Sequence, residues 1–407
     1  MPDPAHVYRA RWLIAADGSA IEDAALVTAG GRIVRVGPWT RMAALVGPAD
    51  AVEHFPDAAI LPGLVNAHTH LGLTDMAGRF RPTANFPAWI GRLAARLFLR
   101  GKAAARDATR RGAEESAAAG TVAGADMTPT PDTGEILPAD AGRWTVFGEV
   151  FGHGDAGIDR LRKVAAAAEH LARTRGTRVG LAPHAPYTAG ISTYAAARRE
   201  ADARGWPLST HLHETLDEIA FTERGEGTLH AWLRRLGMLP AEWRPPGLRP
   251  IRALAEAGFF PGPVLVAHGN YLDDKDIAIL ARSGSSVAFC PRSHAFFKHK
   301  DHPWRRLLAA GVNVCLGTDS LASSPSLSVL DEARYIYARE GGADPRVLLA
   351  MATRNGARAL GLEGEIGNLC EGLAAAACVM APLPRTDDPL GTIMAGAGRV
   401  LRSTALL

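Results

Sequence analysis

The sequence predicts an α/β fold: a (β/α)8 TIM barrel with a small β-sandwich domain formed by the N- and C-terminal segments. Three observations lead to this prediction. The chain has 407 residues, too long for one ordinary core but suited to a barrel of roughly 300 residues with an accessory domain. From about residue 63, short apolar strands alternate with longer amphipathic helices, as in successive βα units. Strand-like segments flank this region on both sides.

The elements follow in order along the chain. Residues 1–62 begin the β-sandwich, because short apolar runs alternate there with turn signals. Residues 63–362 are predicted to form the barrel, and helical stretches such as LDDKDIAILARSG end at the glycine that suits a helix C-cap. Residues 363–407, which include LAAAACVMAP, return as strands to the sandwich. The eight predicted barrel strands are ILPGLVNAHTH, TVAGADM, WTVFGEV, RVGLAPH, PLSTHLHE, VLVAHGN, SVAFCPR and VNVCLGTD.

The composition indicates a small-molecule partner. The chain has 45 Lys and Arg against 42 Asp and Glu, with no basic block or acidic tail of the kind that marks nucleic-acid or membrane partners. Its four cysteines form no CxxC pair, which favours a reducing compartment. We find neither a signal-like start nor an apolar run of about 18 residues, so a cytoplasmic location is expected. A monomer and a homodimer both remain open.

Polar side chains close several of the predicted strands. In a TIM barrel the carboxyl ends of the strands meet at one mouth, where functional groups lie. A single histidine after a strand is more often structural, but several independent strand ends with imidazoles and a carboxylate favour a metal site with an open position for water. In HxH the two histidines share one face of a strand and can hold one ion. The residues at these ends are His68 and His70, His184, His211 and Glu214, His268, and Asp319.

The segments LPGLVNAHTHL, HLHE, AHGN and GTDSLASSPSLSVLDEAR resemble the amidohydrolase superfamily, in its branch of chlorohydrolases and of purine, pyrimidine and nucleoside deaminases. The resemblance implies that His268 contacts the attacking water or the substrate and that Glu214 is the general acid/base. His213, between His211 and Glu214, is expected to point to the other face of its strand. The implied ligands of one divalent transition metal, with zinc favoured and iron or manganese as alternatives, are His68, His70, His211 and Asp319.

The number of metal ions is predicted to be one. Two-metal members of the superfamily bridge their ions with a carboxylated lysine at the end of strand four. Here that strand reads GLAPHAPYT and ends with His184, with no lysine. The alternative is that Glu149, in FGEV, contacts a second ion in place of a structural role.

The resemblance implies hydrolytic deamination of a heterocycle. The metal lowers the pKa of a bound water, Asp319 accepts its proton, the hydroxide attacks a ring carbon, and Glu214 protonates the adjacent ring nitrogen before ammonia leaves. The expected substrate contacts, each with a structural alternative, are Trp89, His184, Tyr187, Arg292 and Ser320.

Within that branch, NFPAWI, CPRSH and GTDSLASSPSLSVLDE are most similar to the deaminases of the alternative menaquinone pathway. This similarity implies an adenosine-like substrate with a carboxyphenyl group, for which Trp89 or Phe86 offers an aromatic surface and Arg292 a planar cation. His294 departs from the commoner asparagine. The alternatives are S-adenosylhomocysteine, adenosine or guanine deamination, or triazine hydrolysis. A non-enzymatic scaffold with this fold would be expected to have lost the ligands, which this chain keeps.

Overall fold

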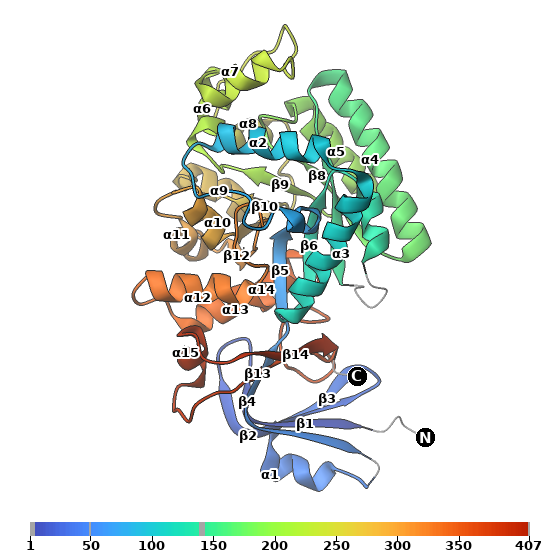
Figure 1. The fold of residues 1–407 in the computed structure, drawn as a ribbon, viewed down its shortest axis with the longest axis vertical. Helices are drawn as coiled ribbons and strands as arrows, with labels where there is room; N and C mark the ends of the chain where they lie inside the picture. Colours follow the sequence, from blue (N-terminus) through green and yellow to red (C-terminus); the bar gives the residue numbers. More distant parts are fainter. Residues whose placement is uncertain (1–4, 49, 138–142, 406–407) are drawn as a thin grey trace. The chain divides into compact units, whose positions relative to one another are not determined.

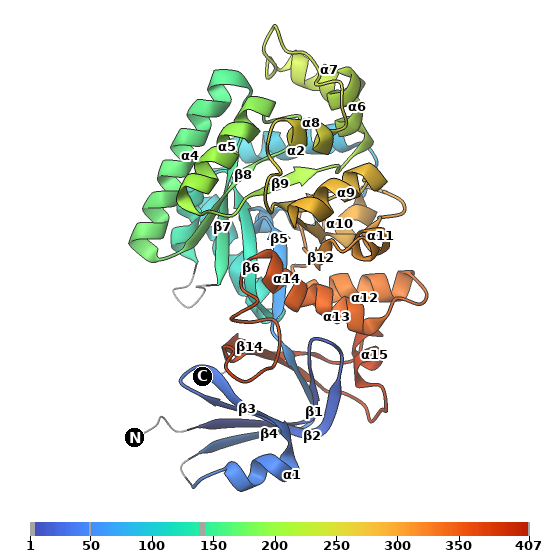
Figure 2. The same cartoon turned by 180° about the vertical axis from the view of Figure 1, so that it is seen from behind.

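The computed structural model describes residues 5–48, 50–137 and 143–405. The chain forms two compact units, which we describe separately and which Figures 1 and 2 show from opposite sides. The first unit comprises residues 1–67, 114–124 and 326–407, and the second comprises residues 68–113 and 125–325.

A six-stranded sheet forms the centre of the first unit, in the order β14-β13-β4-β1-β2-β3. Strand β1 is antiparallel to β2 and parallel to β4, and β13 is antiparallel to β4, so strands from both ends of the chain share the sheet. Tyr8, Leu26, Ile60 and Val379 are buried together in its core. The strands are β1 (His6–Ile14), β2 (Ala20–Ala29), β3 (Arg32–Pro38), β4 (Ala51–Pro62), β13 (Ala376–Ala381) and β14 (Arg399–Ala405).

Short helices complete this unit. Ser328 caps one of them by accepting a hydrogen bond from the Asp331 amide, as serine does at helix N-termini. The helices are α1 (Trp39–Met42), η1 (Ala43–Leu45), α12 (Val329–Arg339), α13 (Pro345–Ala352), α14 (Arg354–Ala359) and α15 (Pro389–Met394).

Two four-stranded sheets, in the orders β5-β6-β7-β8 and β12-β11-β10-β9, supply the strands that carry the site. The pairs β7 with β8, β9 with β10, β10 with β11 and β11 with β12 are all parallel. Single parallel bridges join Thr69 to Asp319 and Leu181 to Leu208, which links the outer strands of one sheet to those of the other. The strands are β5 (Leu64–Thr69), β6 (Thr121–Thr128), β7 (Trp144–Val150), β8 (Arg178–Pro183), β9 (Ser209–Leu212), β10 (Leu265–His268), β11 (Ser286–Phe289) and β12 (Asn313–Leu316).

Helices accompany these strands. Figures 1 and 2 show α4 and α5 side by side along β7 and β8, and both helices end at a glycine in the left-handed conformation, Gly176 and Gly205. No helix among the described residues combines the length and the apolar character that a membrane crossing requires. The helices are η2 (Leu71–Met76), α2 (Phe86–Leu99), α3 (Lys102–Ala118), η3 (Pro131–Ile136), α4 (Gly154–Arg175), α5 (Ile191–Arg204), α6 (Leu216–Arg224), α7 (Gly227–Arg235), α8 (Pro250–Glu256), α9 (Asp274–Ser283), α10 (Pro291–Phe296) and α11 (Trp304–Ala309).

Several predicted strands are longer than the observed ones, and for two of them a particular residue accounts for the difference. ILPGLVNAHTH is divided at Gly63 into the end of β4 and all of β5, and a Cβ at Gly63 would lie 2.4 Å from the side chain of Val122. SVAFCPR ends as a strand at Phe289, because Pro291 lacks an amide hydrogen and begins α10 instead.

Candidate active site and metal centre

A cavity of about 280 Å³ lies at the carboxyl ends of the parallel strands. Its polar wall contains both imidazoles and carboxylates, and its opposite wall comes from the apolar face of α2. The ionisable groups at the strand ends that line the cavity are His70, Glu149, His184, His211, Glu214, His268 and Asp319.

His70 and His211 direct the same ring nitrogen at each other. Nδ1 of His70 lies 3.1 Å from the carbonyl oxygen of Met127, and Nδ1 of His211 lies 3.0 Å from that of His184. Each Nδ1 therefore carries the proton, which leaves the Nε2 lone pairs unprotonated. The two Nε2 atoms are only 3.2 Å apart. Two lone pairs at this distance repel each other unless a cation lies beside both, so this geometry fits a metal ion.

His68 and Asp319 complete this cluster. His68 is fully buried, and neither of its ring nitrogens has a hydrogen-bond partner in the described part of the chain. Its Nε2 lies 3.8 Å from Oδ1 of Asp319, and Nε2 of His70 lies 3.7 Å from the same oxygen. Burial, together with the neighbouring imidazoles, holds the pKa of His68 well below its ordinary value, so the ring is a neutral donor. An orphaned buried imidazole is costly unless a ligand such as a metal pairs with it.

The backbone is unusual at the ends of three strands. His268 has φ +69°, Asp319 has φ +55° and His213 has φ +54°. Left-handed backbone disfavours side chains with a Cβ and is concentrated at functional sites. It turns the chain sharply where the site groups leave the strands.

Glu214 lies beside this group of imidazoles and Asp319. Its Oε1 is 3.7 Å from Nε2 of His268, and both residues are buried. Burial, and then the charges of Asp319 and Glu218, raise the pKa of Glu214 well above its ordinary value. A carboxyl group that keeps its proton in this position can donate it to a substrate atom.

The sequence analysis missed Glu218, which holds the backbone of this segment. One oxygen of Glu218 accepts the His213 amide at 2.8 Å, and the other accepts the Glu214 amide at 2.9 Å. Its only sequence signal is its place four residues after Glu214, in the first turn of α6.

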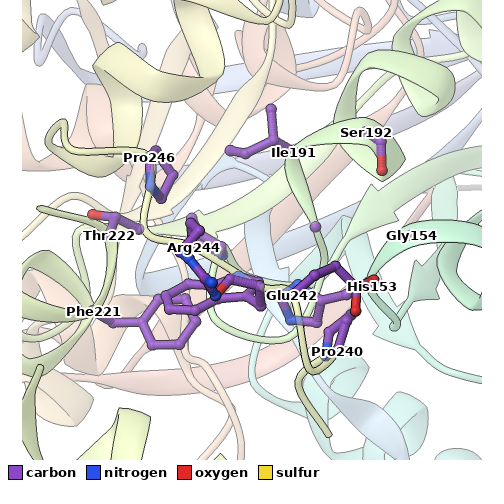
Figure 3. Close-up of a pocket in the computed structure, with 13 residues that line it drawn as sticks. His153, Gly154, Ile191, Ser192, Phe221, Thr222, Pro240, Glu242, Arg244 and Pro246 are labelled. Carbon is purple, nitrogen blue, oxygen red and sulfur yellow. The ribbon is translucent and has the colours of Figure 1, made fainter. Parts of the chain in front are cut away.

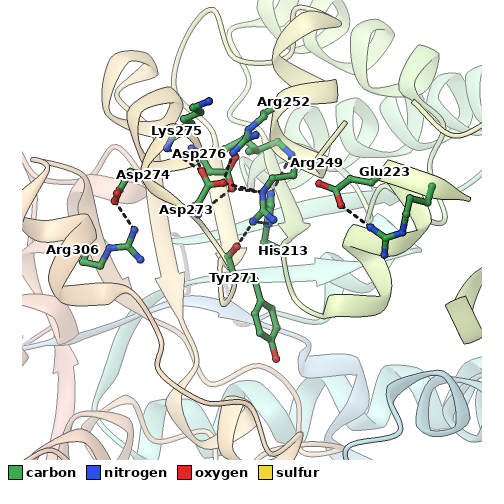
Figure 4. A network of polar contacts seen from close by, with 12 residues as sticks. His213, Glu223, Arg249, Arg252, Tyr271, Asp273, Asp274, Lys275, Asp276 and Arg306 are labelled. Carbon is green, nitrogen blue, oxygen red and sulfur yellow. Dashed lines mark hydrogen bonds and ion pairs between the residues drawn. The ribbon is translucent and has the colours of Figure 1, made fainter. Parts of the chain in front are cut away.

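His213 points away from the cluster, as expected. Its Nε2 accepts a hydrogen bond from the Ile251 amide at 3.3 Å, and its Nδ1 lies 3.5 Å from Nη2 of Arg249. Figure 4 shows Arg249 and Arg252 beside the carboxylates of Asp273 and Asp276, in the network that surrounds this histidine.

A second group of ligand atoms adjoins the first. Glu149, His184 and His211 bring one oxygen and two nitrogens within 4.8 Å of one another. Oε1 of Glu149 lies 4.0 Å from Nε2 of His184 and has no hydrogen-bond partner among the described residues. Burial, with the charges of Asp126 and Asp319, raises the pKa of Glu149 to about 8.

Four of the expected substrate contacts, Trp89, His184, Tyr187 and Ser320, line the cavity. The ring of Trp89 packs 4.9 Å from that of Phe297, and its Nε1 donates to the carbonyl oxygen of Ala322 at 3.4 Å. Tyr187 contacts His184, with 5.9 Å between ring centroids.

Arg292 is not among the described residues that line this cavity, contrary to expectation. The strand in which it was placed ends earlier, and Arg292 belongs to α10. The side chain of Ser293 in that helix points toward Asp319. Successive side chains of a helix are rotated by about 100° around its axis, so the side chain of Arg292 points in a different direction. His294 packs against Phe289 and His299, outside the cavity wall.

A separate cavity of about 250 Å³ lies between the starts of α4 and α5 and the loop after α7. Figure 3 shows its side chains, which include His153, Phe221, Glu242 and Arg244. None of the three metal-type groupings found among the described residues lies in this cavity. We therefore place the candidate site in the cavity beneath α2.

The chain is similar to known proteins along most of its length. The profile of the Amidohydrolase family matches residues 59–399. An aminodeoxyfutalosine deaminase of Deinococcus radiodurans is 33% identical over 328 residues, which cover 76% of this chain and 75% of the relative. A 5-methylthioadenosine/S-adenosylhomocysteine deaminase of Desulforudis audaxviator is 33% identical over 359 residues, which cover 83% of this chain and 76% of the relative.

The fold is also that of a solved structure. An adenosine deaminase of Xanthomonas campestris with bound zinc superimposes with a TM-score of 0.80 at 24% identity, covering 99% of this chain and 92% of that one. At this identity the likeness shows a common fold.

Proposed function

Because this chain belongs to the amidohydrolase family, as its motifs predicted, we propose that it is a metal-dependent hydrolytic deaminase of a purine-nucleoside-like substrate. The observation that carries the proposal is the pair of unprotonated Nε2 atoms of His70 and His211, 3.2 Å apart, with Glu214 in the same cavity. Deamination requires a nucleophile at a metal and an acid near the ring, and the two groups supply both.

One divalent ion, with zinc favoured, would be held by His68, His70, His211 and Asp319. Three neutral imidazoles and one carboxylate suit zinc and also accept iron or manganese. The ion would supply an activated water at neutral pH. In this proposal Glu149 has no ligand role.

The protein side chains would move the protons. Oδ1 of Asp319 faces His68 and His70. The Asp319 carboxylate would take the proton of the attacking water and pass it to the departing amine, so that the nitrogen leaves as ammonia. Glu214 would donate its proton to the ring nitrogen, and His268, 3.7 Å from Glu214, would hydrogen-bond the reacting atoms. Trp89, His184, Tyr187 and Ser320 would position the substrate.

The most specific substrate we propose is 6-aminodeoxyfutalosine, an intermediate of menaquinone biosynthesis. The Deinococcus radiodurans relative, which carries the name of this activity, supports it across three quarters of both chains. The second candidate is 5-methylthioadenosine or S-adenosylhomocysteine, supported by the Desulforudis audaxviator relative. Guanine and triazine-type compounds are the remaining alternative substrates.

We also propose that β5–β12 close into one barrel and that the terminal segments form a β-sandwich. The bridges from Thr69 to Asp319 and from Leu181 to Leu208 support closure, because they join the outer strands of the two parallel sheets. In this proposal the barrel spans residues 63–362 and the sandwich spans residues 1–62 and 363–407.

The test is ammonia release by the purified metal-loaded protein with aminodeoxyfutalosine, 5-methylthioadenosine, S-adenosylhomocysteine, adenosine and guanine. We expect turnover with the highest kcat/KM for aminodeoxyfutalosine. If only the thioether nucleosides are turned over, the proposed substrate is wrong but the proposed deamination reaction stands. A protein that binds no stoichiometric metal and releases no ammonia would be a scaffold, and the proposal would fail.

A further inference from the structure

The cavity extends beyond the metal cluster into a lobe between α2 and α3. Leu93, Ala94 and Leu97 line it from α2, and Ala105 and Thr109 line it from α3. Ala105 and Thr109 are four residues apart and therefore share one helix face. Most of the residues that line the lobe are apolar. The lobe lies on the side of the cavity near His70, because Gly72 also lines the cavity and a Cβ at Gly72 would lie 3.5 Å from Oγ1 of Thr109.

Arg100 lines this same cavity at the point where α2 ends. Its Nη1 donates to the carbonyl oxygen of Gly72 at 2.6 Å and to Oδ1 of Asp75 at 2.7 Å. Asp75 is not among the described residues that line the cavity. The carboxylate of Asp75 therefore holds the guanidinium in place, and Arg100 forms part of the cavity wall.

The other donors of Arg100 are unused. In the described part of the chain its hydrogen bonds are the two from Nη1, and neither Nε nor Nη2 is buried without a partner. These N–H groups are therefore accessible, in a side chain that is only 15% exposed. Among the described residues of the cavity wall, no other arginine or lysine is present.

We propose that Arg100 is the specificity-determining cation of the site, and that it binds a carboxylate on the substituent of the nucleoside. The apolar lobe would take a flat aromatic or aliphatic spacer, and the planar guanidinium would pair with the carboxylate through its unused donors. This inference rests on the proposed deaminase function. It assigns to Arg100 the role that the sequence suggested for Arg292.

This assignment narrows the substrate class. An adenosine-like nucleoside with an aryl carboxylate satisfies both the lobe and the cation. Adenosine and 5-methylthioadenosine have no carboxylate to accept hydrogen bonds from the unused donors of Arg100. The amino acid end of S-adenosylhomocysteine has a carboxylate, but it is aliphatic and has an ammonium group beside it. Selectivity for the carboxylate should therefore depend on Arg100.

The experiment compares aminodeoxyfutalosine with its methyl ester, which lacks the negative charge of the carboxylate and is larger by one methyl group. The variants are Arg100→Met and, as a matched control, Arg92→Met, which removes an exposed arginine of the same helix outside the cavity wall. We expect Arg100→Met to lower kcat/KM for the acid by about 10- to 100-fold, the scale of a charge-assisted hydrogen bond, and to affect the ester much less. Arg92→Met should keep the preference for the acid.

If the ratio of kcat/KM for the acid to that for the ester is the same in Arg100→Met as in the wild type, the assignment of Arg100 is wrong. If this ratio falls in Arg292→Met instead, Arg292 is the residue that binds the carboxylate. If Arg100→Met does not fold, Arg100→Lys serves instead. It keeps the charge without the planar fork and should retain only part of the preference. Wild-type protein that deaminates neither compound would refute the deaminase function itself, which is a different result from deamination of both without preference.

Discussion

The hydroxyl of Ser293 donates a hydrogen bond of 2.7 Å to Oδ2 of Asp319. Ser323 donates to the same oxygen at 2.6 Å, and both serines are buried. Oδ2 is thereby occupied, and Oδ1 is left to face His68 and His70. The two serines therefore fix which oxygen of the carboxylate is available to a metal ion.

Removal of this support should weaken the metal site. Ser293→Ala is expected to lower metal affinity or turnover by about 10- to 100-fold, the usual effect of losing a partner that orients a ligand. Titration with a metal chelator, followed by activity, measures it. Ser283→Ala is the control, because its hydroxyl bonds Leu280 and Ser285 away from the site. Equal chelator resistance in the two variants would show that Ser323 alone orients Asp319.

Glu214 can be separated from metal binding. Glu214→Gln keeps the shape of the side chain but cannot deliver the proton, so we expect full metal content with a loss of at least about 100-fold in kcat. The matched control is Glu223→Gln in α6, whose carboxylate pairs with Arg224. Near-normal turnover by Glu214→Gln at saturating substrate would exclude Glu214 as the acid/base.

Metal content distinguishes one ion from two. Elemental analysis should find about one transition metal per chain, because one set of four ligands surrounds it. His211→Asn should abolish binding, and Glu149→Gln should leave the stoichiometry unchanged. Two ions in the wild type that fall to one in Glu149→Gln would instead place the second ion at Glu149 and His184.

Asp273 offers a test of pH dependence away from the metal. Partial burial raises the pKa of Asp273. Hydrogen bonds from Arg252 and the Asp276 amide, together with the positive charges of Arg252 and Arg249, lower this pKa to about 2. The folded pKa is thus below the unfolded value, so this stabilisation is present above about pH 4 and is lost as the pH falls toward 2.

Asp273→Asn should keep the helix cap and remove the charge. We expect a small drop in Tm, of about 1 to 3 °C at pH 6, since the side chain is half exposed and screened. The drop should shrink when Tm is measured at pH 3. Asp274→Asn, which removes an exposed ion pair with Arg306 at a side chain that is 90% exposed, is the comparison for loss of a surface charge alone. A difference in Tm that does not vary with pH would show that the ion pairs contribute nothing.

The convergence of these imidazoles and Asp319 could be predicted from the sequence because each group lies at or within three residues of the end of a strand. Strand alternation places His68 and His70 on one face, and a parallel arrangement brings the strand ends together. The place of Arg292 could not be predicted from the strand pattern, because Pro291 starts a helix there.

The supporting residues could not be predicted in this way. Ser293, Ser323 and Glu218 act through hydrogen bonds within loops and helix starts, where no periodicity specifies the geometry. Arg100 becomes a cavity residue only because the loop after His70 returns to the end of α2, a contact between segments 28 residues apart.

The left-handed backbone at His268 and Asp319 has a consequence for engineering. Glycine accepts this conformation freely, whereas a residue with a Cβ is disfavoured by about 1 kcal/mol or more. A library selected only for heat resistance would therefore tend to acquire glycine at these two positions, and the survivors would be robust and inactive. An effort to raise the thermal stability of this protein should therefore keep His268 and Asp319 unchanged and substitute other positions.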